Sequence, residues 1–379
     1  MNVCVIGGGG IGSSIACYAA ASGGRVTVYT SRPEDWTHEI IYTDKGSGIS
    51  RAHQLHSATN NPAEAFGTAD IVFLTYPSFM RCRILQELPI YLKQGAVVVL
   101  VPGFGGAEHF CNRLIERGHL VFGLDRAPCV GRVSEYGKSV VASLKTSVRG
   151  ALLRGDCAKE IADMVGGLLG LKCTPLDNYL VVALTPSNPI LHTTRLYEIF
   201  RNVTMQHTFS SNILFYREWG DLASEMLFAC DKELQNICSS FSELNLSEVI
   251  SLRQHYESET PEQLTKKIRS IATLDHIYAP MVEDGGVFVP NLKSRYFTED
   301  FPFGLCILKE LAVVGKVATP CMDEILQWYF RFSSHPYCNW GDIPIPQNFG
   351  ILTKQDVYRF YGRKTFRFAV NKEESVVAV

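Results

Sequence analysis

The chain has 379 residues, more than the roughly 250–300 residues at which a single hydrophobic core stops growing, so we expect two domains. Hydrophobic residues make up 46% of it and charged residues 20%, which is typical of a globular protein. The net charge of −2 provides no basic field for nucleic acid and no polybasic patch for a membrane surface. Neither a signal peptide nor an apolar run of about 20 residues is evident, so we expect a cytoplasmic protein.

Twelve cysteines are scattered along the chain without a Cys-x-x-Cys motif or a close cysteine–histidine pattern. Most of them stand in apolar segments, where a free cysteine behaves as a small buried hydrophobic residue. We therefore expect reduced thiols and no metal site.

A glycine loop follows the apolar opening of the chain. Residues 2–6 predict a buried strand, the small residues of 15–21 predict a helix, and Gly7–Gly12 carry the Gly-x-Gly-x-x-Gly spacing. In this context the first glycine permits a tight turn, the second lets a pyrophosphate approach, and the third lets the helix pack on the strand. The phosphates would face free N–H groups at the helix N-terminus. The predicted cofactor-binding residues here are Gly7, Gly9, Gly10, Ile11 and Gly12.

The next predicted strand, 25–29, bears on which dinucleotide binds. An enzyme that uses NADH usually has an acidic residue at the end of this strand, which bonds the ribose hydroxyl. Here the strand ends in Thr30, Ser31 and Arg32, and the first acidic residue, Glu34, lies beyond a proline. Because a guanidinium pairs well with a 2′-phosphate, we expect NADPH as the cofactor, and NADH stays open. The alternative for Arg32 is a solvated loop residue without a role in binding.

Further apolar runs continue the parallel sheet. Residues 70–77, 96–101 and 120–124 predict strands that are buried on both faces, and 80–92 predict a crossover helix. Ligands of open parallel sheets sit at the carboxyl ends of the strands, which places Tyr76, Pro77 and the turn 103–106 beside the cofactor. Residues 132–148 predict a hairpin that turns at Gly137. We therefore predict a Rossmann-type doubly wound parallel sheet over 1–182.

The second half predicts a mainly helical domain over 183–379. Apolar side chains recur at helical spacing in 221–241, 247–256, 260–271, 303–314 and 322–332. The interface of this domain with the nucleotide-binding domain is the natural place for a substrate. The tail from 333 to 379, with Pro336, Trp340, Pro344 and Pro346, is assigned to no element, and a cap on the helical domain and an oligomer contact both stay open.

Two polar stretches of the second half are not explained by packing. One is a proline-rich turn over 185–192 that delivers His192, and the other is a charged loop over 295–302 that carries Arg295 and Asp300. From the residues alone, catalysis is no better supported than a structural role for these residues. His192 could be a buried core histidine, and Arg295 and Asp300 could be a surface ion pair and a helix cap.

Several motifs together resemble the octopine/nopaline (opine) dehydrogenase family, from the first residues to about Trp328. In the first half they are the glycine loop, Thr75-Tyr76-Pro77-Ser78, Pro102-Gly103-Phe104-Gly105-Gly106 and Arg132-Val133-Ser134-Glu135-Tyr136-Gly137-Lys138. In the second half they are Asn188-Pro189-x-x-His192, Phe215-Tyr216, Cys230-Asp231-Lys232-Glu233 and Arg295-Tyr296-x-x-Glu299-Asp300-x-Pro302-x-Gly304-Leu305. Among these motifs, the combination of Asn-Pro-x-x-His with a distant Arg-(x)4-Asp is the most specific to this family.

The resemblance implies an activity and a set of site residues. The family joins the amine of an amino acid to a 2-oxo acid, such as pyruvate or 2-oxoglutarate, and reduces the imine with NAD(P)H. It implies that His192 is the general acid/base, that Asp300 orients His192, and that Arg295 binds a substrate carboxylate. Asn188 would either hold His192 or contact the substrate. The expected partners are therefore small molecules, with a homodimer left open as the assembly.

Two rival functions stay open. A 2-oxo acid reductase of the ketopantoate or 6-phosphogluconate type shares the Rossmann-plus-helical plan, but such enzymes usually rely on a lysine at the start of the helical domain, and residues 184–196 contain none. A sensor that binds NADPH without turnover is the other, although such a protein has no need of the histidine, arginine and aspartate.

Overall fold

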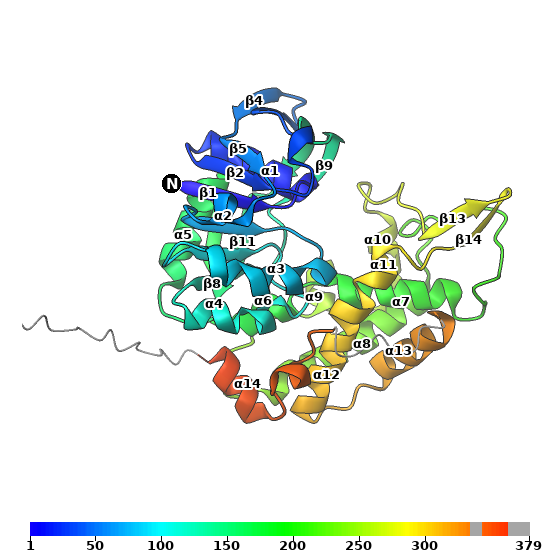
Figure 1. Cartoon of the computed structure of the whole chain (residues 1–379). Helices are drawn as coiled ribbons and strands as arrows, with labels where there is room; N and C mark the ends of the chain where they lie inside the picture. The colour runs from blue at the N-terminus through cyan, green and yellow to red at the C-terminus, as the bar shows by residue number, and fades with distance from the viewer. Residues whose placement is uncertain (334–342, 363–379) are drawn as a thin grey trace, which may run out of the picture.

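The computed structural model describes residues 1–333 and 343–362. Of the predicted tail, Pro336 and Trp340 lie outside these ranges, as does Cys338. The described chain forms a sheet-containing lobe and a mainly helical lobe (Figure 1). This confirms the predicted fold class, a Rossmann-type parallel sheet followed by a helical domain.

An eight-stranded sheet forms the centre of the first lobe. Across the sheet, its strands are β12 (Lys172–Pro175), β11 (Ser147–Leu152), β8 (Leu120–Leu124), β7 (Val97–Leu100), β6 (Ile71–Leu74), β1 (Asn2–Ile6), β2 (Arg25–Tyr29) and β5 (Ser57–Thr59). All neighbouring strands pair in parallel except β11, which runs antiparallel to β8. The carboxyl ends of β1, β6, β7 and β8 therefore meet at one edge of the sheet.

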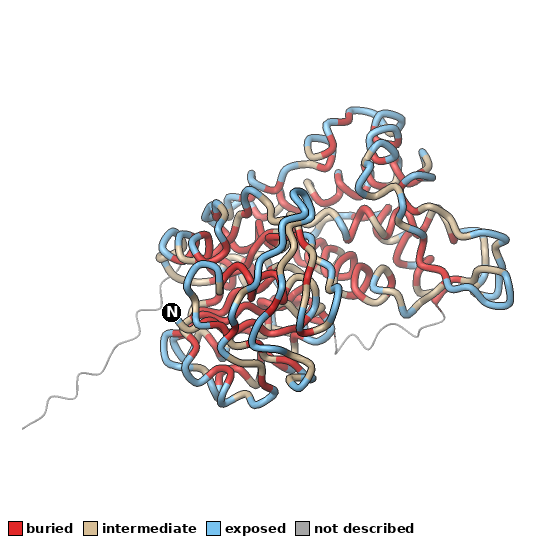
Figure 2. The backbone as a smooth tube through the Cα atoms, turned by 90° about the horizontal axis from the view of Figure 1, so that it is seen from above, coloured by how far each residue is buried: buried red, intermediate tan, exposed pale blue. Residues whose placement is uncertain are grey.

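Alternate residues of the central strands enter two hydrophobic clusters, one on each face of the sheet. On one face the helices are α2 (Pro62–Phe66), α3 (Ser78–Tyr91), α4 (Asn112–Glu116) and α6 (Tyr179–Leu184). On the other they are α1 (Gly10–Ala21) and α5 (Ala158–Leu169). Figure 2 shows the buried centre that results.

A second, four-stranded sheet covers the outer face of α1. Its order is β4 (Ser50–Gln54), β3 (Glu39–Asp44), β10 (Ser139–Leu144) and β9 (Cys129–Glu135). Because α1 lies between two sheets, residues 12–19 are all buried, which explains why this helix consists mostly of small residues and has no charged side chain. The predicted hairpin is confirmed as β9 and β10, with Gly137 at a φ of +73° in the turn. Its predicted end was wrong, because Val148 belongs to β11 in the main sheet.

The helical lobe contains the predicted helices with altered ends. Its elements are α7 (Asn188–Phe200), α8 (Asp221–Ser240), α9 (Leu252–Tyr256), α10 (Pro261–Arg269), the hairpin β13 (Met281–Asp284) and β14 (Val287–Pro290), α11 (Arg295–Thr298), the π-helix η3 (Phe301–Leu305), α12 (Cys306–Gly315) and α13 (Pro320–Ser333). The predicted helix over 247–256 forms only at its end, as α9. Residues 188–192, predicted as a turn, begin α7, and the predicted loop over 295–302 is mostly helical.

The described part of the tail packs against both lobes. It contains η4 (Pro346–Phe349) and α14 (Lys354–Tyr361), which lies below the first lobe in Figure 1. Gln347 donates to the carbonyl of Glu310 in α12, whereas the hydroxyl of Tyr361 donates to Glu108 in η2 (Ala107–Cys111). The predicted boundary between residues 182 and 183 falls within α6, which packs on β8 and β11, and it stays a prediction.

Within the described ranges, no helix is long and apolar enough to cross a membrane. In the same residues, no group of three or more histidine, cysteine, aspartate or glutamate side chains is placed to hold a metal ion. Nine of the eleven described cysteines are buried, as expected for cysteines that pack as hydrophobic residues.

Candidate functional site

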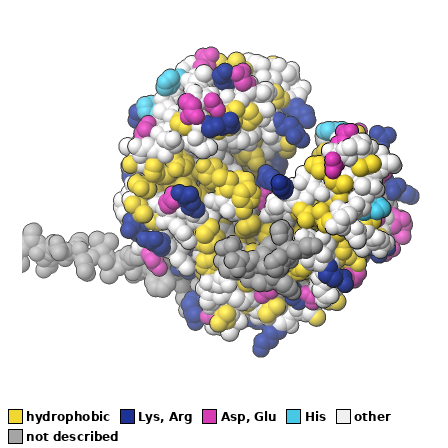
Figure 3. Space-filling view, turned by 45° about the vertical axis from the view of Figure 1, so that its right-hand side comes forward, with side chains coloured by type: hydrophobic (Ala, Val, Ile, Leu, Met, Phe, Trp, Pro, Cys, Tyr) yellow, Lys and Arg dark blue, Asp and Glu magenta, His cyan; other side chains and the backbone are white. Residues whose placement is uncertain are grey.

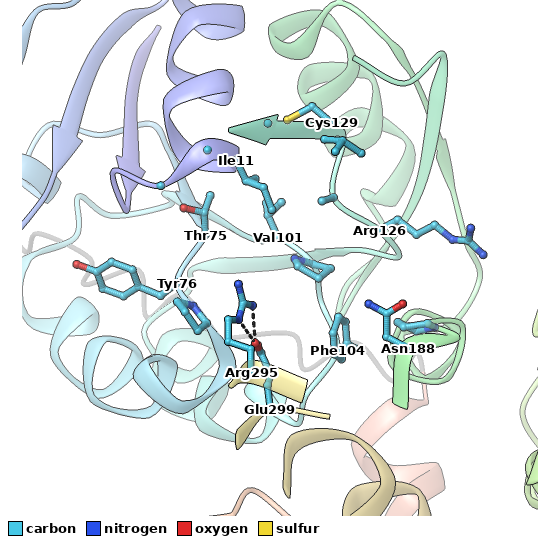
Figure 4. Close-up of a pocket in the computed structure, with 18 of the residues that line it drawn as sticks. Ile11, Thr75, Tyr76, Val101, Phe104, Arg126, Cys129, Asn188, Arg295 and Glu299 are labelled. Atoms are coloured by element: carbon cyan, nitrogen blue, oxygen red, sulfur yellow. Dashed lines mark hydrogen bonds and ion pairs between the residues drawn. The ribbon is translucent and has the colours of Figure 1, made fainter. Parts of the chain in front are cut away.

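A cavity of about 860 Å³ lies where the carboxyl ends of the parallel strands face the helical lobe. Figure 3 shows the hollow between the lobes, and Figure 4 shows residues that line the cavity. The cavity brings together most of the predicted site residues: Gly7, Gly9, Gly10, Ile11, Gly12, Tyr76, Pro77, Asn188, His192, Arg295 and Asp300. Thr30, Ser31 and Arg32 do not line it.

The glycine loop has the geometry that a dinucleotide requires. Gly7 has a φ of +112°, in the region that favours glycine. A Cβ atom on Gly12 would lie 1.9 Å from the carbonyl oxygen of Gly7, so the start of α1 approaches the strand closely. A Cβ atom on Gly9 would meet nothing within 4 Å, which leaves room for a phosphate beside the loop. Gly9 also caps α1 without any side-chain acceptor for the first N–H groups. These residues fit a dinucleotide cofactor.

Gly10 has a packing role besides its place in the loop. A Cβ atom there would lie 2.1 Å from the carbonyl oxygen of Gly131 in β9. The hairpin β9–β10 therefore crosses directly over the start of α1, and only a glycine permits this approach.

The end of β2 is arranged around Tyr136, a residue that the sequence reasoning did not assign to the site. The hydroxyl of Tyr136 lies 2.6 Å from Thr30 Oγ1, and the guanidinium carbon of Arg32 lies 4.0 Å from the centre of the Tyr136 ring. Arg32 also pairs with Asp35 at 3.4 Å and keeps 56% of its side chain exposed. The strand end therefore presents an exposed arginine on an aromatic ring, outside the cavity itself.

Arg81, which the sequence reasoning also missed, joins two of the turns beside the cavity. Its Nε donates to the carbonyl of Tyr76 at 2.8 Å, and its Nη1 donates to the carbonyls of Pro102 and Phe104 at 2.8 and 2.9 Å. The side chain is buried, which lowers the pKa of Arg81. Three backbone acceptors thus hold this guanidinium and fix the turns after β6 and β7 relative to each other.

His192 lies between an acidic and a phenolic partner. Its Nδ1 is 2.7 Å from Asp300 Oδ2, and its Nε2 is 2.9 Å from the hydroxyl of Tyr216. An ionised carboxylate only accepts hydrogen bonds, so Nδ1 carries the proton and Nε2 accepts from Tyr216. The ring of Tyr296 meets the imidazole edge-on, with centroids 4.6 Å apart. The predicted contact between His192 and Asp300 is therefore present, and Tyr216 is an additional partner.

Burial shifts the pKa values of the two partners of His192. It raises the pKa of Asp300, and the neighbouring His192 opposes that rise. It also raises the pKa of Tyr216, so the phenol keeps its proton and remains a donor to His192. The arrangement holds the imidazole at the cavity wall between the Asp300 carboxylate on Nδ1 and the Tyr216 phenol on Nε2.

Arg295 lines the cavity and pairs with the buried Glu299, a residue that the sequence reasoning did not single out. Its Nε donates to Glu299 Oε2 at 2.6 Å, while Glu299 Oε1 accepts from the amide and hydroxyl of Ser78 at 2.9 and 3.0 Å. Burial would raise the pKa of Glu299, but the charge of Arg295 and the Ser78 hydrogen bond outweigh it, so the pKa is lowered. The side chain of Arg295 is 69% exposed, so it can still meet an anion (Figure 4).

Asn188 occupies the first position of α7 and lines the same cavity. Because α7 has 3.6 residues per turn, Asn188 and His192 lie on one face of the helix, one turn apart. Neither ring nitrogen of His192 bonds Asn188, since Asp300 and Tyr216 occupy them. Of the two roles left open from the sequence, a contact with substrate suits this position better.

Comparison with known proteins finds similarity over both lobes. A family model described as the alpha-helical domain of NAD/NADP octopine/nopaline dehydrogenase matches residues 175–332, and a model described as ketopantoate reductase PanE/ApbA matches residues 3–137. Tauropine dehydrogenase of Arabella iricolor is 26% identical over 369 residues, which cover 88% of this chain and 92% of that protein. Opine dehydrogenase of Haliotis discus hannai is 26% identical over 357 residues, which cover 85% and 87%.

Solved structures show the same fold. A structure of octopine dehydrogenase with NADH and L-arginine superposes with a TM-score of 0.84 at 22% identity, over 97% of this chain and 100% of that chain. A structure of yersinopine dehydrogenase with NADP+ superposes with a TM-score of 0.68 at 14% identity, over 94% and 99%.

Proposed function

The chain belongs to the opine dehydrogenase family of oxidoreductases, and we propose that it joins the amine of an amino acid to a 2-oxo acid and reduces the resulting imine with NAD(P)H. The observation that carries this proposal is the Asp300–His192–Tyr216 group, which shares one cavity with Arg295 and the glycine loop. The product is an N-(1-carboxyalkyl) amino acid. One C–N bond and one C–H bond form, and the carbonyl oxygen leaves as water.

The proton steps fall to His192. Its Nε2 accepts a proton from the ammonium group of the donor, so that the amine can attack the carbonyl carbon, and later returns this proton to the hydroxyl that leaves as water. Asp300 fixes the tautomer and stabilises the imidazolium that forms between these steps. Both transfers need Nε2, so the Tyr216 hydroxyl must give up this nitrogen or pass the proton on.

The remaining residues position the reactants. Arg295 binds the carboxylate of the 2-oxo acid, which turns the carbonyl carbon towards the cofactor. The glycine loop together with Tyr76 and Pro77 holds the dinucleotide, which supplies the hydride. Asn188, at the start of α7, contacts the substrate.

A requirement for an amine tests this function. With NADPH and a 2-oxo acid such as pyruvate or 2-oxoglutarate, oxidation of the cofactor should be at background until an amino acid is added. The second candidate function is a 2-oxo acid reductase, favoured by the ketopantoate reductase model that matches residues 3–137. Rapid oxidation without any amine would support that reductase and overturn the proposal.

Tyr216 is expected to position His192. Phenylalanine at this site keeps the ring against Phe215 and Trp219 but removes the donor to Nε2. We expect Tyr216→Phe to lower kcat by about tenfold, the size of one hydrogen bond, with the melting temperature little changed. Steady-state kinetics and a thermal melt measure both quantities. A kcat equal to that of the unaltered protein would mean that this contact does not matter for turnover.

Cofactor preference is proposed to rest on Arg32, with Thr30 and Ser31 beside it, and to favour NADPH. The exposed guanidinium on the Tyr136 ring is free to meet a 2′-phosphate by exchanging its weak surface pair with Asp35. Arg32→Glu should therefore lower the ratio of kcat/KM for NADPH to that for NADH by about 10- to 100-fold. Arg51→Glu on the exposed strand β4 makes the same charge change away from the cofactor and should leave the ratio unaltered. An unchanged ratio in the Arg32 variant would remove Arg32 from the cofactor site.

A further inference from the structure

The charges around the cavity do not cancel. Each acidic side chain of its lining has a basic partner: Asp125 accepts from Arg149 at 2.9 Å, Glu299 from Arg295, and Asp300 lies against His192. Arg81 donates hydrogen bonds to three backbone carbonyls. The remaining cationic lining residues are Arg126 and Lys145. Neither of them forms an ion pair with any residue in the described ranges.

These two cations are close enough to repel each other. Burial lowers the pKa of Lys145, and the charge of Arg126 lowers it further, while Asp125 and Cys129 oppose the shift. Holding two like charges at a cavity wall without an ion-pair partner for either costs free energy, and a bound anion reduces that cost. The anions of the proposed reaction are the cofactor phosphates and the acidic groups of the two substrates.

The position of Arg126 argues against the cofactor phosphates. Arg126 follows β8, whereas the glycine loop follows β1, and β7 and β6 lie between these strands. Three strand spacings of about 4.8 Å place the two strand ends roughly 14 Å apart. Arg126 instead faces the helical lobe, where its charge acts on His255 and Tyr256 in α9.

The same part of the cavity is lined by the start of α7. Ser187 caps this 13-residue helix without a side-chain hydrogen bond to its amides, and Asn188 follows. In Figure 4, Arg126 extends above Asn188, on the opposite side of Phe104 from Arg295. An anion between Arg126 and the start of α7 would therefore meet a guanidinium and the positive end of a helix.

We propose that Arg126, supported by Lys145, binds the acidic group of the amine donor. The inference rests on the proposed function, because its product carries two acid groups and Arg295 accounts for only one. The donor is thus an amine that bears a carboxylate, or a similar anionic group, near its nitrogen. Arg295 and Arg126 would bind the two acid groups from opposite sides and leave the new C–N bond between them.

The test compares donors that differ only in the acid group. The best amino acid from a panel of the twenty common ones and its decarboxylated amine are assayed at saturating NADPH and 2-oxo acid. The unaltered protein should prefer the amino acid in kcat/KM, and Arg126→Gln should reduce this preference about 10- to 100-fold, the worth of a charge-assisted hydrogen bond. Arg126→Lys, which keeps the charge, should retain part of the preference. Arg51→Gln, an exposed control, should retain all of it.

Each other outcome overturns the inference. The preference could be the same in Arg126→Gln as in the unaltered protein, or the variant could instead raise KM for the 2-oxo acid or for NADPH. Arg295→Gln, assayed in parallel, should raise KM for the 2-oxo acid and leave the preference between donors intact. If the unaltered protein condenses no amino acid at all, the proposed function itself is wrong and the donor site falls with it. A fluorescence titration with NADPH confirms that each variant is folded.

Discussion

Replacing His192 by alanine should reduce turnover by about 10²- to 10⁴-fold, the usual contribution of a positioned general acid/base. The change removes the group that we propose accepts the ammonium proton and returns it to the leaving hydroxyl. NADPH affinity should be largely intact, because His192 belongs to α7 in the helical lobe, whereas the proposed site of the dinucleotide is the glycine loop. Steady-state assays give turnover, and fluorescence titration gives the dissociation constant of NADPH.

The chain offers a matched control for this variant. His276 also stands beside an aspartate, Asp275, at 3.4 Å, but its side chain is 66% exposed. His276→Ala should therefore turn over like the unaltered protein. Wild-type turnover in His192→Ala would contradict the assignment of His192.

Replacing Asp300 by asparagine should have an effect of similar size, on the order of 10²- to 10⁴-fold in kcat. Asparagine has nearly the same shape, but its amide can donate to Nδ1 and so permits the tautomer with the proton on Nε2. That tautomer cannot accept the ammonium proton. The substitution also removes the negative charge that stabilises the imidazolium. Single-turnover measurements, started with NADPH already bound, separate this loss from any change in cofactor binding.

Asp275→Asn is the corresponding control, since it removes a carboxylate from the exposed aspartate–histidine pair. A kcat for Asp300→Asn within about threefold of the unaltered protein would show that the 2.7 Å contact with His192 has no role in turnover.

The glycine loop could be predicted from sequence because all its signals are local. An apolar strand, three spaced glycines and a run of small residues lie within 21 residues, and each has a direct physical meaning. The small residues of α1 were read correctly as a helix, but the four-stranded sheet that covers them was predicted only as one hairpin. Strands β3 and β4 have few buried residues, so their hydrophobic pattern is weak.

The proposed catalytic group was predicted from the family resemblance rather than from a local pattern. His192 and Asp300 are 108 residues apart, and no local rule joins them. The stretch that carries His192 was predicted as a turn because of its two prolines, yet Pro189 occupies the first turn of α7, where proline is tolerated.

The residues that were missed act through long-range contacts. Tyr136 meets Thr30 across 106 residues, and Glu299 meets Ser78 across 221. Within residues 1–333 and 343–362, the hydrogen bonds of Arg81 go to backbone carbonyls, which leave no trace in the sequence. Tyr216 belonged to a recognised motif, Phe215-Tyr216, but its hydroxyl could be placed on His192 only once the fold was known.

The central claim is that the hydride reaches the carbon of an imine formed from both substrates. The most direct measurement is the mass of the product formed from NADPH carrying deuterium at the transferred position, an amino acid and a 2-oxo acid. The account predicts one compound with the summed mass of both substrates, less one water, plus one deuterium and one hydrogen. A deuterated 2-hydroxy acid, with the amino acid recovered unchanged, would contradict it.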